Sequence, residues 1–273
     1  MEEFTHRFDD TKIPVEKDYP PENGFLEIHA MIWDSKNDGA TFYEENIQYK
    51  DSFLYQTMSQ IPYINQTSNS SRGYVVYNDQ PCVENYRAKW KPSWCAHVKG
   101  IEWDPRNKDA KTAHAKGMMA FDQDGGFWIT HSVPGFPRNS TLFDGWYFAW
   151  AERKFAQAFM CMSMSTDTLN SVAEGMSISH PYVQEYDIPS SIKPHVYKIY
   201  DWVKEDYYAD GNSTQVVKTV GGTDIHIIEH YDNPHTDLWD DLVAPYLKTN
   251  LHVETFCQAS RDCCICHNIC KFV

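Results

Sequence analysis

The feature that most constrains the fold is a pair of short apolar runs separated by a glycine-rich turn. Residues 116–121 read KGMMAF, residues 127–131 read FWITH, and DQDGG lies between them. Two runs of strand length joined by a short turn with adjacent glycines are typical of a β-hairpin. We therefore expect an antiparallel pair of strands here and a fold built around a sheet.

Strand and helix patterns alternate along the rest of the chain. Apolar alternation or short buried runs predict strands at residues 26–32, 73–77, 155–164 and 224–229. Helical spacing predicts helices at residues 167–178, 195–208 and 236–249. In the last of these, Thr236 or Asp237 can cap the helix and Pro245 can kink it. The interleaving predicts a mixed α/β (α+β) fold, in which helices flank a mixed sheet.

The charge of the chain limits the conditions under which it can bind nucleic acid. The formal net charge at neutral pH is −14, and phosphate contacts require clustered Lys and Arg. Protonation of all 12 His would change the formal charge to −2. We expect either DNA binding that is weak or confined to acid pH, or an ordinary acidic secreted protein with no such partner.

Several features point to the secretory route. Four Asn-x-Ser/Thr sequons occur, at Asn65, Asn69, Asn139 and Asn212. Eight cysteines, five of them between residues 257 and 270, fit an oxidising compartment, and their pairing stays open. No apolar run is long enough for a membrane span, and the acidic start MEEFTH is unlike a signal peptide. We expect a secreted or lysosomal protein, either already mature or with its true start upstream, and no membrane partner.

The residues with chemical potential form an H-x-K pattern at the start of the predicted hairpin. In a strand, His114 and Lys116 would point to the same face. An imidazole can attack phosphorus while an ammonium stabilises a phosphate oxygen, so the pair suits phosphodiester cleavage. Chance supplies about one such match in a chain of this composition. A second pattern, at His97 and Lys99, is interpreted as a surface histidine in an irregular loop over residues 82–111.

The context of His114 resembles a known family. From residue 114 to 137 the chain reads HAKGMMAFDQDGGFWITHSVPGFP, which looks like the signature of the deoxyribonuclease II family. Residues 77–81, YNDQP, resemble a second family motif. Residues 240–242 and 249–253 resemble a third, so the matches run in order from about residue 73 to 256. The rival histidine, His97, has no such surroundings.

The resemblance implies a phospholipase D-like fold and a metal-independent active site without a cofactor. Family members join two H-x-K motifs: one histidine attacks phosphorus, and the other protonates the leaving 5′-oxygen to give 3′-phosphate products at acid pH. Carried over, His114 is a catalytic histidine and Lys116 its phosphate-holding partner. His131, Asn78 and Asp79 match positions that support the site, and His131 is equally open to a purely structural role.

The chain departs from the family pattern in its last part. Residues 138–273 contain no second H-x-K. We therefore expect an N-terminal arm at 1–24, a deoxyribonuclease II-like domain at 25–256 with one full and one incomplete half, and a Cys-rich tail at 257–273. This pattern predicts a truncated, catalytically impaired member of the family. An early cysteine of the family is also missing, which leaves the pairing of Cys161 uncertain.

Two alternatives remain beside the impaired nuclease. Two copies of the chain could combine their H-x-K motifs in an active homodimer. The tail could instead bind a soft metal, because Cys and His side chains suit zinc or copper(I). Its candidate ligands are Cys263, Cys264, Cys266, His267 and Cys270. Disulfides or a disordered tail are the simpler interpretations of the same residues.

Overall fold

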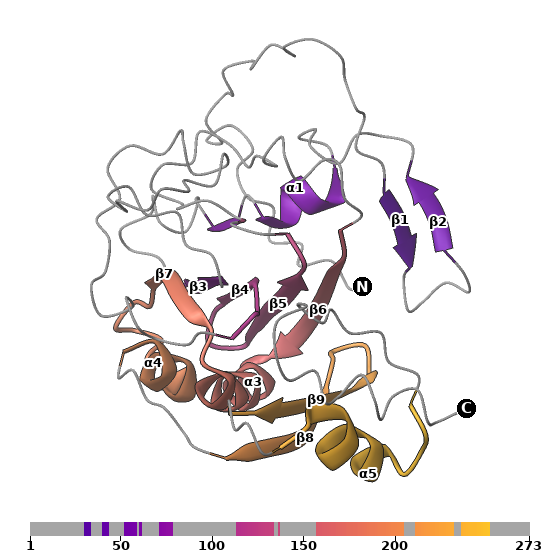
Figure 1. Ribbon diagram of the computed structural model, residues 1–273. Helices are drawn as coiled ribbons and strands as arrows, with labels where there is room; N and C mark the ends of the chain where they lie inside the picture. Colours follow the sequence, from indigo (N-terminus) through magenta and orange to yellow (C-terminus); the bar gives the residue numbers. More distant parts are fainter. Residues whose placement is uncertain are drawn as a thin grey trace, which may run out of the picture.

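The computed structural model gives a mixed α+β fold, as the sequence predicts, centred on a five-stranded sheet (Figure 1). It describes residues 30–33, 40–43, 52–58, 60–61, 71–78, 113–133, 136, 157–204, 211–231 and 236–251, the first two ranges by backbone alone. Helices α3 and α4 lie along one face of the sheet, and the separate hairpin β8–β9 lies beside α3 (Figure 1).

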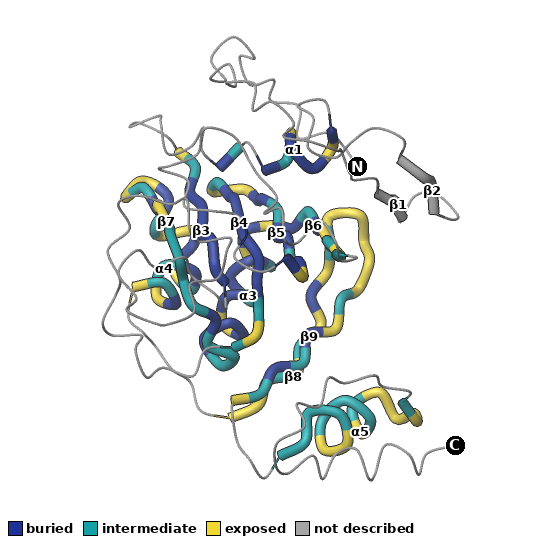
Figure 2. The backbone as a smooth tube through the Cα atoms, turned by 45° about the horizontal axis from the view of Figure 1, so that its top comes forward, coloured by how far each residue is buried: buried dark blue, intermediate teal, exposed yellow. Residues whose placement is uncertain are grey.

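The central sheet has the strand order β6-β5-β4-β3-β7, and all four pairings are antiparallel. Its strands are β3 (Gly73–Asn78), β4 (Gly117–Phe121), β5 (Gly125–His131), β6 (Phe159–Ser165) and β7 (Tyr182–Asp187). The predicted hairpin is confirmed as β4 and β5, and the strands predicted at 73–77 and 155–164 are confirmed as β3 and β6. The strands β3 and β4 are buried on both faces, which explains their continuous apolar runs (Figure 2).

The turn of the hairpin is shorter than its two glycines suggest. Gly125 and Gly126 belong to β5, and Asp122 forms the turn by accepting hydrogen bonds at Oδ1 from the amides of Asp124 (2.8 Å) and Gly125 (3.1 Å). A Cβ atom at Gly126 would overlap the Ala120 carbonyl oxygen of the facing strand. This glycine is therefore required by the close approach of two backbones, and the aspartate makes the turn.

Two helices close one face of the sheet. The helices predicted at 167–178 and 195–208 are confirmed as α3 (Thr166–Ser179) and α4 (Tyr197–Lys204). Ser165 caps α3, because its Oγ accepts a hydrogen bond from the Thr168 amide (3.2 Å). The helix ends at His180, whose φ of 58° is left-handed.

The last predicted helix has two parts. A π-helical segment, η6 (Leu238–Val243), leads into a short helix, α5 (Ala244–Leu247). Asp237, and not Thr236, is the cap: its Oδ1 accepts from the amides of Trp239 and Asp240, both at 2.8 Å. Pro245 lies in the first turn of α5, where the missing amide hydrogen costs little, so the predicted kink coincides with the change of helix type.

The remaining elements are mostly ones that the sequence patterns did not single out. They are β1 (Ala30–Trp33), β2 (Ala40–Tyr43), α1 (Phe53–Met58) and β8 (Asn212–Lys218). The strand β1 overlaps the end of the one predicted at 26–32, and β9 (Asp224–His230) confirms the one predicted at 224–229. None of the helices in the described ranges is both long and apolar enough to span a bilayer.

Two hydrophobic clusters lie on opposite faces of the central sheet. Val75, Tyr77 and Met119 face α3, α4 and the β8–β9 hairpin. Val76 and Met118, one position along each strand, belong to the second cluster, which includes side chains of α1. Successive side chains of a strand point to opposite faces, so the same two strands supply both cores.

Candidate active site

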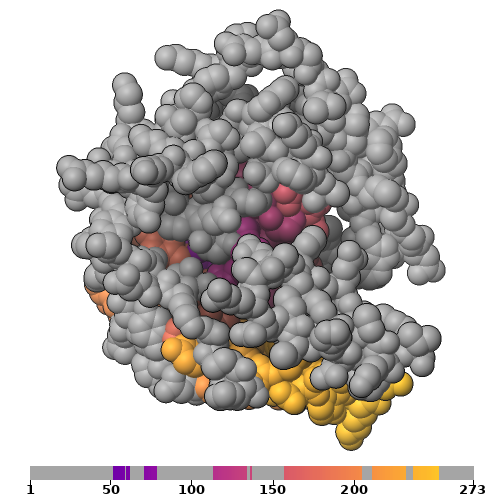
Figure 3. All heavy atoms as spheres, in the orientation of Figure 1, coloured from indigo at the N-terminus to yellow at the C-terminus, as the bar shows by residue number. Residues whose placement is uncertain are grey.

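The H-x-K pattern lies just before β4, at one end of the central sheet. His114 is exposed, and the amide of Ala115 donates to the carbonyl of Ala113 (2.7 Å), which makes a tight turn around His114. Lys116 is only 4% exposed, and its carbonyl accepts from the His131 amide (3.1 Å). Because β4 begins at Gly117, the shared orientation expected of His114 and Lys116 stays a prediction. Figure 3 shows atoms in magenta, the colour of residues 113–133 as a whole, at this face of the molecule.

The glycine that follows Lys116 is required by Tyr77. A Cβ atom at Gly117 would overlap the Tyr77 hydroxyl and the Ile129 carbonyl oxygen. The Tyr77 hydroxyl accepts a hydrogen bond from Trp128 Nε1 (2.8 Å) and forms another with the Thr130 side chain. The Thr130 hydroxyl also lies 3.4 Å from the Lys116 carbonyl oxygen. Burial and these contacts therefore hold the backbone at Lys116 in place, with Tyr77 acting from β3 and Thr130 from β5.

Two further motif residues secure the segment that follows β5. Asn78 is fully buried, and its Nδ2 donates to the carbonyl of Phe136 (2.8 Å). The amide of Val133 donates to His131 Nδ1 (3.2 Å). The Asn78 motif and the His131 motif, more than fifty residues apart in the chain, therefore meet beside Lys116. The structure brings together four predicted site residues at one end of the sheet: His114, Lys116, His131 and Asn78.

The environment of His131 keeps its imidazole neutral. Burial, with the nearby positive charge of Lys116 as a second cause, lowers the pKa of His131 from its ordinary 6.5 to about 3. Phe136 and Phe159 pack against the ring, with centroids at 5.4 and 5.5 Å. Since Nδ1 accepts from Val133, the proton of the neutral ring is on Nε2, which is buried and has no partner among the described residues. At acid pH His131 can donate a hydrogen bond, but it is not an imidazolium acid.

The segment that enters His114 is tied to the end of α3. The amide of Ala113 donates to the carbonyl of His180 (3.0 Å), the residue that ends the helix in a left-handed conformation. The His180 ring in turn packs against Tyr231, with centroids 5.1 Å apart. No sequence pattern marked this anchor, because it joins positions that lie 67 residues apart in the printed sequence.

Several predicted residues lie outside the described ranges. These are Asp79, the rival His97, the sequon residues Asn65, Asn69 and Asn139, and the tail residues Cys263, Cys264, Cys266, His267 and Cys270. The remaining sequon residue, Asn212, is exposed at the start of β8. Cys161 of β6 is a free thiol. Across the ranges that the structure describes, no three His, Cys, Asp or Glu side chains are grouped to hold a metal ion.

Sequence reasoning missed three residues of the site. Tyr77, Trp128 and Thr130 form the hydrogen-bonded support beneath Lys116 and Gly117. All three lie inside the quoted motifs, so the motifs contained them without indicating what they do. Their role depends on the strand register, in which Tyr77 and Thr130 both pair with Gly117.

Comparison with known proteins identifies the relatives of this chain. It is 26% identical over 235 residues to cell death-related nuclease 6 of Caenorhabditis elegans, covering 85% of the chain and 54% of that protein. It is 24% identical to deoxyribonuclease-2 of C. elegans, over 92% of the chain and 68% of the relative. With deoxyribonuclease-2-alpha of Bos taurus the identity is 22%, over 71% and 48% of the two chains. The chain thus spans about half to two thirds of these proteins.

The family model shows where the chain belongs. The model of deoxyribonuclease II matches residues 11–269, nearly the whole sequence. This match includes every motif residue that surrounds Lys116 in the structure. The chain therefore belongs to the deoxyribonuclease II family.

Proposed function

We propose that this chain is a secreted or lysosomal deoxyribonuclease II-like protein that carries one half of a phosphodiester-cleaving site. His114 would attack phosphorus, and the Lys116 ammonium would offset the charge that develops on the phosphate oxygens. The observation that carries the proposal is the pairing of an exposed histidine with a buried lysine whose backbone is fixed by other family motif residues.

The same site favours impaired activity in a lone chain. When His114 attacks, the bond from phosphorus to the 5′-oxygen breaks, and this oxygen must receive a proton. His131 is unsuited to supply it, because burial lowers its pKa to about 3. Residues 138–273 contain no second H-x-K that could do so. A positioned acid typically contributes about 10²–10⁴-fold, so we expect slow cleavage at best.

The substrate and the compartment follow from charge and accessibility. A chain of net charge −14 repels DNA near neutral pH, whereas protonation of its histidines would remove most of that charge. We therefore propose acid-dependent DNA binding. The exposed Asn212 supports glycosylation in the secretory pathway, because an oligosaccharide requires an accessible asparagine.

The test is a nicking assay with the 273-residue chain and supercoiled plasmid. It is run in EDTA at pH ~5, where a free imidazole with pKa ~6.5 is mostly protonated, which weakens the repulsion of DNA, while about 3% of it stays neutral and able to attack phosphorus. We expect nicking about 10²–10⁴-fold slower than by a family member with both motifs, and 3′-phosphate ends. His114→Ala should abolish it, and the matched variant His97→Ala should not. Activity that survives His114→Ala would refute the assignment.

A homodimer with a composite site is the second candidate, favoured by the same missing acid. Two copies would each contribute His114 and Lys116 to one cleft. The nicking rate should then rise with the square of the protein concentration, and sedimentation should show a dimer in the same range. Mixing in excess His114→Ala protein should suppress the wild-type rate, which a monomeric enzyme would not show.

Metal binding by the tail is a third proposal, for residues 257–273 alone. Thiolate and imidazole ligands favour zinc or copper(I). Metal analysis of the chain with and without those residues tests it directly. An equal metal content in both forms would exclude the tail as the site.

A further inference from the structure

Glu229 is a buried carboxyl group that the proposed chemistry does not use. It lies on the face of β9 that packs against α3, between the buried Ile227 and the exposed Tyr231, and is only 8% exposed. Its Oε2 has no hydrogen-bond partner among the described residues. A buried carboxylate oxygen without a partner is costly, so this environment favours the neutral acid over the carboxylate.

The last turns of α3 are shaped to receive this carboxyl. Gly175 lies directly against it, and a methyl group at that position would overlap the Glu229 carboxyl. Tyr231, the residue that follows β9, packs on the ring of His180, the residue that caps the end of α3. The end of the β9 segment therefore contacts the last part of α3 at two places, five residues apart along the helix. Figure 1 shows β9 beside α3.

The end of α3 leads to the catalytic segment. The His180 carbonyl accepts the hydrogen bond of the Ala113 amide at 3.0 Å, immediately before His114. A continuous path of contacts therefore runs from Glu229 through Gly175 and His180 to the backbone at His114. If β9 moves away from α3, His180, whose carbonyl accepts from the Ala113 amide, loses the packing of Tyr231 on its ring.

We propose that Glu229 is a positioning residue whose protonated carboxyl seats β9 on α3 and thereby orders the backbone at His114, so that the site is held in acid and loosens as the pH approaches neutrality. The functional meaning of this ordering rests on the proposed role of His114. The contact path itself does not, and it can be tested without DNA.

Burial, and not the charge of a neighbouring group, is the main influence on the pKa of Glu229. The titratable side chains on the neighbouring elements include Tyr77 of β3, Glu174 of α3 and His180 at its C-cap, His230 of β9, and Asp240 and Asp241 of η6, which also packs against β9. The Glu174 carboxylate is paired with Lys198, and His230 Nε2 lies 2.9 Å from the Thr236 carbonyl oxygen. Opposite Glu229 on β8 is the uncharged Ser213. Burial raises the pKa of Glu229 to about 8, and the charge of Glu229 is one cause that raises the pKa of Tyr77.

The direction of the effect follows from proton linkage. When β9 is detached, the Glu229 carboxyl has its ordinary pKa of 4.5. When β9 is packed on α3, the pKa of the same carboxyl is about 8. Below pH 4.5 both states are protonated, and detachment is hardest. From 4.5 toward 8 only the detached state ionises, so detachment becomes easier, and above 8 the effect levels off.

The experiment is hydrogen exchange of the Ala113 amide in the full chain, read as a protection factor so that the intrinsic pH dependence is removed. Between pH ~5 and pH ~7.5 we expect protection in the wild type to fall by about 10- to 100-fold. Glu229→Gln keeps the shape and cannot ionise, so its protection should stay flat. Glu229→Ala, which loses the contact, should lower protection at every pH.

A matched control lies on the same strand. Asp224 is exposed and pairs with Lys218 at 3.0 Å, so Asp224→Asn should keep the wild-type pH dependence. The proposal is overturned if wild-type protection does not change with pH, or if it falls equally in Glu229→Gln. An inactive chain with the expected exchange pattern would reject the nuclease and retain the positioning role, whereas an active chain with flat exchange would do the reverse.

Discussion

Gly117 shows how a motif residue can be explained by packing instead of by chemistry. The Tyr77 ring and hydroxyl occupy the space beside its Cα, and the Ile129 carbonyl closes the other side. Trp128 and Thr130 hold the hydroxyl in place by hydrogen bonds. Because Gly117 has no side chain, the Tyr77 ring can pack directly against the backbone next to Lys116.

We predict that Gly117→Ala destabilises the protein by about 1–3 kcal/mol, the usual cost of forcing an extra methyl group into a packed core. Denaturant unfolding of both proteins measures the difference. Gly221→Ala is the matched control, because its nearest neighbour would lie 3.8 Å away in an exposed turn, and it should change stability little. Because Gly→Ala lowers the entropy of the unfolded chain and should by itself stabilise, an equal loss in both variants would show that overlap with Tyr77 is not responsible.

Only those site residues that belong to a recognisable sequence motif could be predicted from the sequence. His114 and Lys116 were identified because their residue types suit phosphate chemistry and their context resembles a family. Glu229 and the His180 carbonyl could not be found in this way, since one lies in an ordinary apolar strand and the other is a backbone atom. Their positions depend on how β9 docks on α3, which no local pattern specifies.

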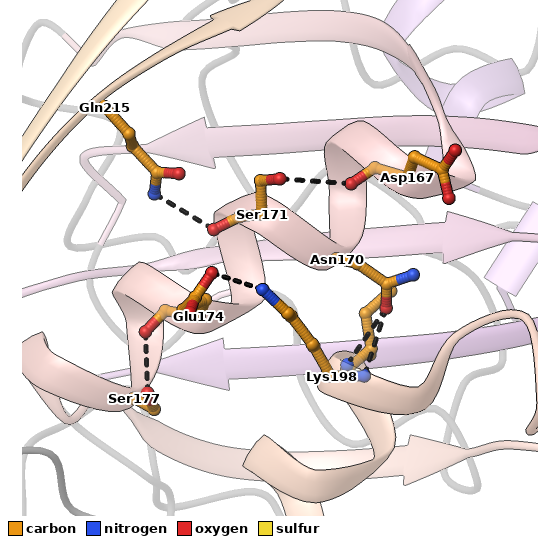
Figure 4. A network of polar contacts seen from close by, with 8 residues as sticks. Asp167, Asn170, Ser171, Glu174, Ser177, Lys198 and Gln215 are labelled. Atoms are coloured by element: carbon orange, nitrogen blue, oxygen red, sulfur yellow. Dashed lines mark hydrogen bonds and ion pairs between the residues drawn. The ribbon is translucent and has the colours of Figure 1, made fainter.

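At the scale of elements, α3 is the connection between the sheet, the second helix and the outer hairpin. Asn170 of α3 is buried and organises the start of α4: its Oδ1 accepts from the amides of Lys198 (3.2 Å) and Ile199 (3.4 Å). Its Nδ2 donates to the His195 carbonyl (2.7 Å). Figure 4 shows the contacts of its Oδ1. One side chain thus supplies the acceptor that the first amides of α4 lack.

We predict that Asn170→Ala destabilises the protein by about 2–3 kcal/mol, because it leaves buried amide and carbonyl groups without partners. The neighbouring ion pair between Glu174 and Lys198 is the comparison (Figure 4). Glu174 is 60% exposed, so Glu174→Gln should cost less than about 1 kcal/mol. Denaturant midpoints at one pH distinguish the two, and a larger loss in Glu174→Gln would contradict this reading.

Strands with continuous burial were all predicted, whereas of the partly buried strands β6 and β9 were predicted and β7 and β8 were not. The strands β3, β4 and β5 are buried and carry long apolar runs. The strand β7, YVQEYD, lies at the sheet edge and is at most half-buried, and β8, NSTQVVK, is largely exposed. Neither has an apolar face long enough to mark a strand, so both were missed.

At the scale of the whole molecule, protonation acts on both faces of the sheet. His131 belongs to the face that includes Lys116, and its pKa is lowered by burial. A histidine with a lowered pKa stabilises the fold fully above its ordinary 6.5, and the contribution falls as the pH drops toward about 3.

We predict that the wild type loses about 2 kcal/mol more unfolding free energy than His131→Gln between pH ~7.5 and pH ~5. Glutamine cannot titrate, and it can still accept a hydrogen bond from the Val133 amide. Denaturant unfolding at the two pH values measures the difference, and nitrogen chemical shifts report the state of the ring. An imidazolium signal from His131 at pH ~5 would show the prediction to be wrong.

The two buried groups have opposite pH responses, and together they give the molecule a preferred acidity. The pKa values of His131 are 6.5 free and about 3 folded, and those of Glu229 are 4.5 and about 8. Between pH 4.5 and 6.5, unfolding lets Glu229 release a proton and His131 take one up. The pH slopes of their contributions to the free energy of unfolding therefore cancel, and the sum of the two contributions is flat and maximal. Below pH 4.5 the contribution of His131 falls unopposed, and above pH 6.5 that of Glu229 does, so the sum decreases on both sides. These two groups therefore favour the folded state most at weakly acidic pH, the condition inside the lysosomal compartment that is one of the two proposed above, whether or not the chain still cuts DNA.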